Sequence, residues 1–255
     1  MDWLYPLSGL LVGVIVGLTG VGGGSLMTPL LVLVFGIQPA VAVGTDLLYA
    51  AITKSGGVVA HSRRGHIDWK VVKLLAAGSV PAALLTTLVL QQLKIDASHT
   101  ATLIKSTLGV ALILTAAAII LRTRVTRFSR QSGWIKPHQV APATVIIGAV
   151  LGVMVTISSV GAGAVGVAAL FFLYPNLPTV RIVGTDIAHA VPLTLVAGLG
   201  HATLGTVDYS LLGSLLIGSL PGIWIGSHLS ARLPEHWLRA GLAAMLLLVG
   251  GKLVY

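Results

Sequence analysis

Two aspartates and a histidine stand inside long apolar stretches of this 255-residue chain, where an ionisable side chain marks a functional site by default. Asp46 and Asp186 each close a Gly-Thr-Asp triplet with Thr45 and Thr185, and His189 follows Asp186 by one helical turn. A carboxylate beside an imidazole can pass a proton near neutral pH, so we expect proton coupling through Asp186 and His189. Because both triplets come early in their apolar stretches, a helix N-cap is the alternative role for the two aspartates.

Two lysines also stand in apolar stretches, and both are candidate ligands for an anion. Lys54 lies eight residues after Asp46, about 80° round a helix, so the two side chains share one face loosely. Lys105 lies in a later stretch. Either ammonium could face a cavity that takes an anion, form a salt bridge between packed helices, or reach along its own stem to the polar surface.

Glycines gather in the middle of two further apolar stretches, with hydroxyl side chains beside them. Glycine costs about 1 kcal/mol relative to alanine inside a helix, so each cluster predicts a break. A helix that restarts after a break presents free backbone N–H groups and a positive dipole end, which bind anions. Close packing of small residues between helices is the alternative. The predicted substrate-binding residues are Thr19, Gly20, Gly22, Gly23, Gly24 and Ser25 at the first break, Ser158, Ser159, Gly161 and Gly163 at the second, and Thr45, Asp46, Lys54, Lys105, Thr185 and Asp186.

The composition places these residues in a polytopic membrane protein. Hydrophobic residues make up 55% of the chain and charged residues 9%, against about 25% charged residues in an average soluble protein. Mean hydropathy is +0.96. A helix needs about 20 apolar residues to cross a bilayer. The predicted fold class is all-α, with apolar segments over 7–36, 41–60, 69–91, 101–121, 140–173, 182–200, 209–229 and 237–254.

The net charge of +9 is also explained by a membrane protein. Basic residues cluster at Arg63 and Arg64 and again along 122–138. Such clusters at helix ends orient membrane proteins, and we favour this reading over nucleic-acid binding. The chain has no cysteine, so disulfides and thiol chemistry are excluded. The first apolar segment has neither a basic leader nor a small-residue cleavage site, so we expect no cleaved signal peptide.

The sequence repeats itself at an offset of 139 residues, which becomes 140 after one inserted residue. The matched blocks include Gly22-Gly23-Gly24 with Gly161-Ala162-Gly163, Gly44-Thr45-Asp46 with Gly184-Thr185-Asp186, and Gly78-Ser79-Val80-Pro81 with Gly218-Ser219-Leu220-Pro221. We therefore divide the chain into a first transmembrane repeat at 1–121, a basic linker at 122–138 and a second repeat at 139–255. Each repeat has four segments, the first of which is broken at its glycines.

Two polar positions between the matched blocks repeat as well. His61 and Asp68 reappear as His201 and Asp208 at the ends of predicted helices. Each aspartate precedes an apolar run and is typical of an N-cap. The histidines lie seven residues upstream, which is not a metal-ligand spacing, so we expect structural turns and no metal site.

The two halves have two alternative arrangements. If each broken segment crosses the membrane, both halves have four spans and lie parallel; if each enters and returns, the second half is inverted. With Lys54 and Lys105 left out, the inverted arrangement places twelve Lys and Arg on one side and two on the other, and the parallel arrangement ten and four. The positive-inside rule favours the stronger asymmetry, so we expect inverted repeats.

Several of these motifs together resemble the TauE/SafE sulfite exporter family. They are the glycine-rich opening that ends in Gly20-Val21-Gly22-Gly23-Gly24, the P-x-x-A-V-G-T-D block at 39–46, the H-x-R-R-G-H-I-D-W turn at 61–69 and the repeated G-S-x-P. The resemblance covers both halves and implies an inner-membrane permease, often an exporter, for sulfite, sulfonate, thiosulfate or similar anions. By position it implies a site at 20–25, at 158–163 and around Thr45 and Thr185. The second break here reads Ser-Ser-Val-Gly-Ala-Gly, so the two halves are unequal.

Residues and resemblance together lead us to expect a secondary transporter and not an enzyme. A small sulfur-containing oxyanion would bind at the paired half-helix starts and cross a cell inner membrane by alternating access, with the bilayer and protons as partners and no cofactor. No G-x-x-x-x-G-K-[S/T] motif occurs, so an ion gradient or a separate subunit must drive transport. A passive anion channel is the main alternative, and an intramembrane hydrolase with a serine nucleophile such as Ser25 is a remote one. Substrate identity, direction, coupling ion and oligomeric state stay open.

Overall fold

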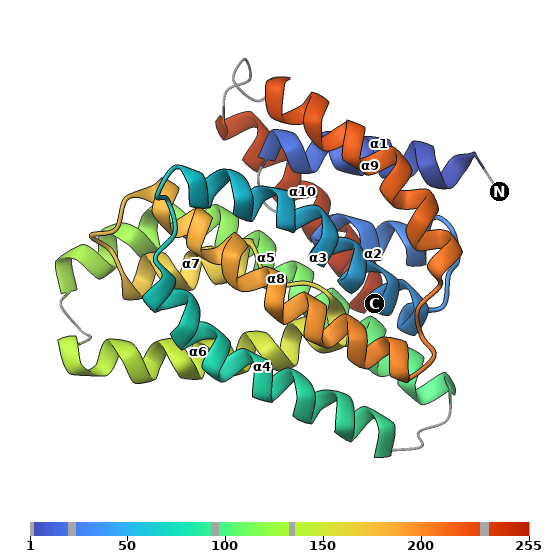
Figure 1. Ribbon diagram of the computed structural model, residues 1–255, viewed down its shortest axis with the longest axis horizontal. Helices are drawn as coiled ribbons and strands as arrows, with labels where there is room; N and C mark the ends of the chain where they lie inside the picture. Colours follow the sequence, from blue (N-terminus) through green and yellow to red (C-terminus); the bar gives the residue numbers. More distant parts are fainter. Residues whose placement is uncertain (1–2, 20–23, 93–96, 133–135, 230–234, 255) are drawn as a thin grey trace.

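The structure, a computed structural model, describes residues 3–19, 24–92, 97–132, 136–229 and 235–254 (Figure 1). These residues form ten helices and no strand, which confirms the all-α prediction for the described part of the chain. The helices are α1 (Leu4–Thr19), α2 (Gly24–Leu33), α3 (Pro39–Arg63), α4 (Trp69–Gln92), α5 (Ala97–Ser132), α6 (Pro137–Ser158), α7 (Ala164–Leu173), α8 (Thr179–Thr203), α9 (Tyr209–Leu229) and α10 (Glu235–Val254).

Five of the described helices are long and apolar enough to cross a membrane, namely α4, α8 and the apolar parts of α5, α6 and α9. Parts of α1, α7 and α10 are apolar but shorter. The helices follow the predicted segments closely, with one difference. The fourth predicted segment ends at 121, whereas α5 continues to Ser132, so much of the basic segment 122–138 extends the same helix.

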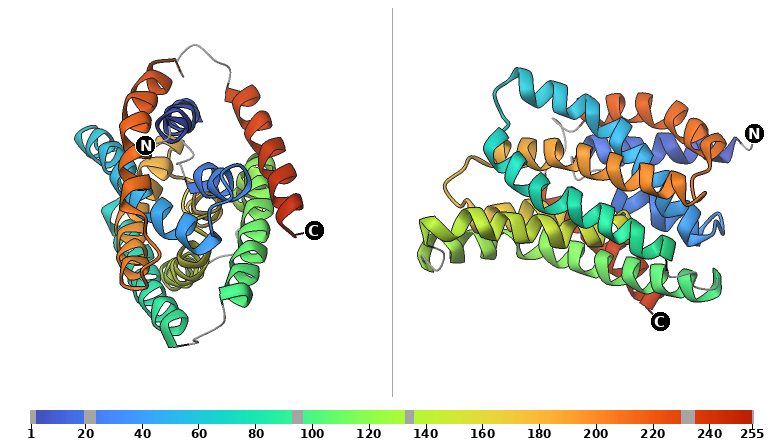
Figure 2. Two further views of the ribbon diagram at one scale, coloured as in Figure 1. Left: turned by 90° about the vertical axis from the view of Figure 1, so that its right-hand side faces the viewer. Right: turned by 60° about the horizontal axis from the view of Figure 1, so that its bottom comes forward.

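Two long helices, α3 and α8, pack side by side in opposite directions at the centre of the molecule (Figure 1). The left view of Figure 2 shows α5 and α10 together on one flank and α4, α8 and α9 on the other. The short helix α2 contacts α3 and α10, and the short helix α7 contacts α8 and α5. The two short helices therefore lie between the central pair and the α5–α10 flank.

Glycines allow the outer helices to approach each other closely. Helix α1 packs along α9, and a Cβ at Gly9 would overlap the backbone carbonyl of Leu215. Helix α6 packs along α4 in the same manner, with Gly148 against the carbonyl of Leu75. Contacts through small residues of this kind are common between helices in membranes, where apolar side chains alone give no driving force for association.

Each central helix is hydrogen-bonded to a turn of the opposite half of the chain, the turn before α9 or the turn before α4. The Thr45 Oγ1 atom on α3 accepts a hydrogen bond from the backbone N–H of Asp208 at 3.0 Å. Thr185 Oγ1 on α8 accepts the matching bond from the N–H of Asp68 at 2.9 Å. The turn before α4 and the turn before α9 lie at opposite ends of the molecule (Figure 1).

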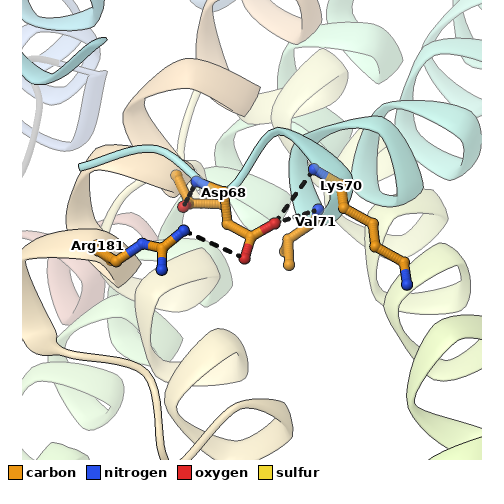
Figure 3. A network of polar contacts seen from close by, with 5 residues as sticks. Asp68, Lys70, Val71 and Arg181 are labelled. Carbon is orange, nitrogen blue, oxygen red and sulfur yellow. Dashed lines mark hydrogen bonds and ion pairs between the residues drawn. The ribbon is translucent and has the colours of Figure 1, made fainter. Parts of the chain in front are cut away.

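The aspartates in these turns cap the helices that follow, as predicted. Asp208 Oδ1 accepts from the N–H of Leu211 at 2.9 Å, and Asp68 Oδ1 accepts from Val71 at 3.3 Å. Asp68 also lies 3.7 Å from the Arg181 guanidinium, so this turn carries an ion pair (Figure 3). The corresponding stretch of the first half, 40–43, has no charged residue, so the other turn has no such partner from this position.

The connection between α6 and α7 is not helical. Helix α6 ends at Ser158 and α7 begins at Ala164. Between them Ser159, Gly161 and Gly163 have φ values of 58°, 125° and 135°, a region that favours glycine. In the first half α1 ends at Thr19 and α2 begins at Gly24, and the predicted break at 20–23 lies outside the described residues.

Candidate functional site

The side chain of Lys54 connects the two halves of the chain. It lies on α3 and is only 8% exposed. Its Nζ donates a hydrogen bond to the carbonyl oxygen of Ala162, in the connection between α6 and α7, at 3.0 Å. The negative charges that attract the ammonium are Asp186 first and Asp46 second. One buried cation therefore lies beside two acids and a non-helical segment.

Asp186, on α8, lies beside the beginning of α7. Its side chain is 2% exposed. A Cβ added to Gly166, in the first turn of α7, would overlap Oδ1 of Asp186, so only a glycine leaves room for the carboxyl. The Lys54 ammonium and the backbone N–H of Gly163 are the neighbouring groups that attract the carboxylate. The carboxyl thus points at a helix start, where backbone N–H groups have no helical acceptor.

Asp46 is fully buried beside α2. Its Oδ2 accepts a hydrogen bond from the Thr28 hydroxyl of α2 at 2.5 Å. Ser159 lies beside the same carboxyl, close enough to attract its charge but without a well-formed hydrogen bond. The N-cap alternative for the two aspartates is wrong, because α3 begins at Pro39 and α8 at Thr179, seven residues before each of them.

Several buried polar atoms of this region have no hydrogen-bond partner, although buried polar groups are nearly always paired. They include Ser25 Oγ, Ser159 Oγ and one oxygen of each aspartate, the Oδ1 atoms of Asp46 and Asp186. Both hydroxyls are less than a tenth exposed. Unpaired donors and acceptors concentrated in one buried region indicate a place for a polar ligand or water.

Two further pairs flank the aspartates at matched positions. His189 Nε2 and Ser79 Oγ are 2.8 Å apart, which joins α8 to α4. Tyr49 and Ser219 face each other in the same way between α3 and α9, without a well-formed hydrogen bond. Neither His189 Nδ1 nor Asp186 Oδ1 has a partner, so the carboxyl–imidazole contact expected from their one-turn spacing is not formed through these atoms.

Other predicted site residues lie apart from this cluster or serve local structure. Lys105 is exposed on α5, and no described contact joins it to Lys54 or the aspartates. The hydroxyls of Thr45 and Thr185 hold the two turns. Ser158 Oγ bonds the carbonyl of Met154 at 2.7 Å, at the end of its own helix. Gly20, Gly22, Gly23 and the side chain of Thr19 lie outside the described residues, and Gly24 is the first residue of α2.

Several residues that contact Asp46, Asp186 or His189, or a neighbour of theirs, were not predicted from the sequence. They are Thr28, Tyr49, Ser79, Gly166 and Ser219. Ser79 and Ser219 were visible as the serines of the repeated G-S-x-P block, and Tyr49 matches His189 in the repeat. Thr28 and Gly166 carry no such signal, because only the packing of α2 on α3 and of α7 on α8 brings them to the aspartates.

The chemistry of the cluster suits an anion and exchangeable protons. An ammonium, free hydroxyls and the N–H groups of a helix start are donors for an oxyanion. The two buried carboxyls can each hold a proton. Among the described residues no group of three His, Asp or Glu side chains could hold a metal ion.

The known proteins that this chain resembles are described as membrane transporters. The family described as "Sulfite exporter TauE/SafE" matches residues 5–253. "Probable membrane transporter protein YjnA" of Bacillus subtilis (strain 168) is 45% identical over 250 residues, which cover 97% of this chain and 98% of the relative. "Probable membrane transporter protein YdhB" of the same strain is 31% identical over 83% of each chain. A "Probable membrane transporter protein" of Xylella fastidiosa (strain 9a5c) is 26% identical over 84% of this chain and 79% of the relative. No solved structure matches the chain.

Proposed function

This chain belongs to the TauE/SafE sulfite exporter family, and on that premise we propose that it exports a small sulfur-containing oxyanion such as sulfite, a sulfonate or thiosulfate. The chain is an integral multi-pass membrane protein, and its relatives carry the names of membrane transporters and not of enzymes. The proposal adds the substrate class, the direction, the site and a location in a cell inner membrane.

The observation that carries the proposal is the position of Lys54. Its ammonium reaches the carbonyl of Ala162 across the interface between the halves, beside the start of α7. An anion at this position would meet the ammonium, the unpaired Ser159 hydroxyl and the N–H groups of residues 161–163. Charge-assisted hydrogen bonds of this kind are about twice as strong as neutral ones. The anion site predicted at 158–163 would therefore include a buried cation, Lys54, from the first half of the chain.

We also propose that the two halves are inverted repeats which alternate access to this site. The antiparallel α3 and α8, and turns that lie at opposite ends and are held by Thr45 and Thr185, support an inverted pair. In such transporters one repeat moves against the other around a site near the midplane. Release of one turn while the other holds would open the site to one side only.

The proposal is tested with purified protein in two steps. Sulfite, methanesulfonate and thiosulfate are screened for stabilisation against heat, since a ligand at a hundredfold excess over its Kd adds about 2.7 kcal/mol. The protein is then reconstituted into liposomes to measure flux of the ligand that stabilises it. We expect saturable flux that rises when the same anion is present on the far side. Absence of both stabilisation and flux with all three anions would refute the substrate class, and flux without saturation or counterflow would indicate a channel.

A further inference from the structure

The Asp186 carboxyl occupies the place at the start of α7 where an anion would bind. Helix α7 spans ten residues, and its first turn includes Gly166, against which Oδ1 of Asp186 lies. The N–H of Gly163 and the ammonium of Lys54 both attract this carboxylate. These are the same donors that the proposed function gives to the substrate. A bound oxyanion and an ionised Asp186 would therefore compete for one set of donors.

The Asp186 carboxyl does not form all of its possible hydrogen bonds at this position. Asp186 is 2% exposed, and its Oδ1 atom has no hydrogen-bond partner. A buried carboxylate that keeps an unpaired oxygen is costly, whereas a protonated carboxyl loses most of that cost. The geometry therefore has two self-consistent states. In one the ionised carboxyl holds the helix start and the ammonium; in the other the carboxyl is neutral and a separate anion holds them.

The net charge of the site also favours an exchange of the ionised Asp186 carboxyl for a bound anion. With both acids ionised, Asp46, Asp186 and Lys54 sum to one negative charge. An anion added to that set would place three negative charges around one ammonium in a buried site. A proton on Asp186 removes one of the three and frees the donors it used.

The titratable surroundings of Asp186 are few. Lys54 faces it from α3 and also lies beside Asp46, and His189 lies one turn along α8. His61, near the end of α3, lies against Gly184 two residues before it. Helix α7 carries no titratable side chain. Helices α4 and α6 also pack against α8. Their titratable side chains for which the structure describes the exposure are Lys70, Lys73 and His138, and all three are exposed near the helix starts.

We propose that Asp186 is an internal substitute for the substrate: its carboxylate holds the α7 start in the empty transporter, and a proton taken from water releases that place to the anion. Each anion then enters together with one proton, which leaves Asp186 again when the anion departs. The inference rests on the proposed anion site and identifies the group that couples it to protons. It moves the coupling role from an Asp186–His189 pair to the carboxyl of Asp186 alone.

The test uses methanesulfonate, because its charge does not change between mildly acidic and mildly alkaline buffer, and full-length protein in detergent. In the wild type we expect the affinity to fall about tenfold per pH unit once Asp186 ionises, as linkage to one proton requires. Asp186→Asn, a neutral isostere, should bind at least as tightly as the wild type at its best pH and lose the pH dependence. Asp208→Asn, which keeps an N-cap residue at an exposed turn, and His189→Gln should keep the wild-type slope.

Different results would contradict the role of Asp186 and the proposed anion transport. Methanesulfonate binding that is equally tight at every pH, or a pH slope retained by Asp186→Asn or lost in His189→Gln, overturns the inference and leaves the anion site intact. Failure of the wild type to bind any of the three anions refutes both. If Asp186→Asn does not fold, proton uptake by the wild type in weakly buffered solution decides the matter. In the pH range where affinity falls tenfold per unit, one proton taken up per bound methanesulfonate is expected, and none contradicts the inference.

Discussion

Lys54 is a single cation shared by two acids, and this asymmetry sets the chemistry of the site. The residue at the matching position of the second half is Thr194, whose hydroxyl bonds the carbonyl of Ala190 within its own helix. The two halves therefore supply matched carboxyls, Asp46 and Asp186, but only the first supplies an ammonium. A single substrate anion fits this distribution of charge better than two symmetric anions.

Replacement of Lys54 by methionine should weaken anion binding about tenfold to a hundredfold, because a hydrogen bond to a charged group contributes about 1.5–3 kcal/mol. Stability should fall as well, since two buried acids lose their counter-charge. The double variant Lys54→Met/Asp186→Asn should recover part of that stability. Calorimetric titration with methanesulfonate and thermal unfolding measure both effects. Lys105→Met, at an exposed position of α5, is the matched control, and wild-type affinity in Lys54→Met would contradict the assigned role.

Replacement of Ser159 by alanine should weaken anion binding without lowering the stability of the protein. The hydroxyl is buried without a partner, so its removal should leave the melting temperature unchanged or raise it. The loss of one neutral hydrogen bond should weaken anion affinity by roughly threefold to tenfold. The same titrations test this. Thr115→Val on α5 removes a buried hydroxyl that already bonds Ala111, and it should leave affinity unchanged. Equal affinity in Ser159→Ala and the wild type would remove this hydroxyl from the site.

The central helices depend on close approach between each Gly-Thr-Asp triplet and the turn of the opposite half. A Cβ at Gly44 would overlap the backbone oxygen of Thr206, and a Cβ at Gly184 would overlap that of His66. The glycine in each triplet is therefore required by packing, and the threonine that follows it fixes the turn by a hydrogen bond. The same triplets then carry the aspartates inward to the cluster.

Gly44→Ala and Gly184→Ala should each destabilise the protein by about 1–3 kcal/mol, because backbone atoms cannot move aside as a flexible side chain could. Gly56→Ala on the same helix α3 is the control, since a Cβ there meets nothing within 4 Å. It should stabilise by up to about 1 kcal/mol through helix propensity alone. Thermal unfolding in one detergent compares the three variants. Equal melting temperatures for Gly44→Ala and Gly56→Ala would show that the approach is not required.

Helix positions could be predicted from the sequence because they depend on local signals, while the site depends on contacts between distant residues. Long apolar runs, with Pro39 and Gly65 at boundaries, mark α3 and its ends. The N-cap alternative for Asp46 is wrong because α3 begins at Pro39, seven residues before it. The contact of Lys54 with Ala162 joins residues 108 apart, and no spacing in the sequence predicts it.

At the scale of the whole molecule, each half completes the other. Helix α1 of the first half packs on α9 of the second, and α6 of the second packs on α4 of the first. Lys54 crosses the same interface in the buried interior. Neither half contains a complete set of donors and acids by itself, so movement between the halves would necessarily rearrange the site.

The inverted arrangement predicts that the two turns face opposite sides of the membrane. The natural chain has no cysteine, so Ser62→Cys and Thr203→Cys each introduce one thiol beside a turn at an exposed position. A membrane-impermeant maleimide added to right-side-out vesicles should label one variant, and inside-out vesicles should label the other. Labelling of both variants from the same side would contradict inverted repeats and require the parallel arrangement.

We propose that a small oxyanion binds between Lys54 and the connection at 159–163. A structure determined with selenite, a heavier analogue of sulfite whose selenium is located by anomalous scattering, tests it most directly. We expect the selenite oxygens to accept hydrogen bonds from the Lys54 ammonium and from backbone N–H groups near Gly163. Selenium more than about 10 Å from the connection at 159–163, beyond the reach of a helix terminus, would contradict it.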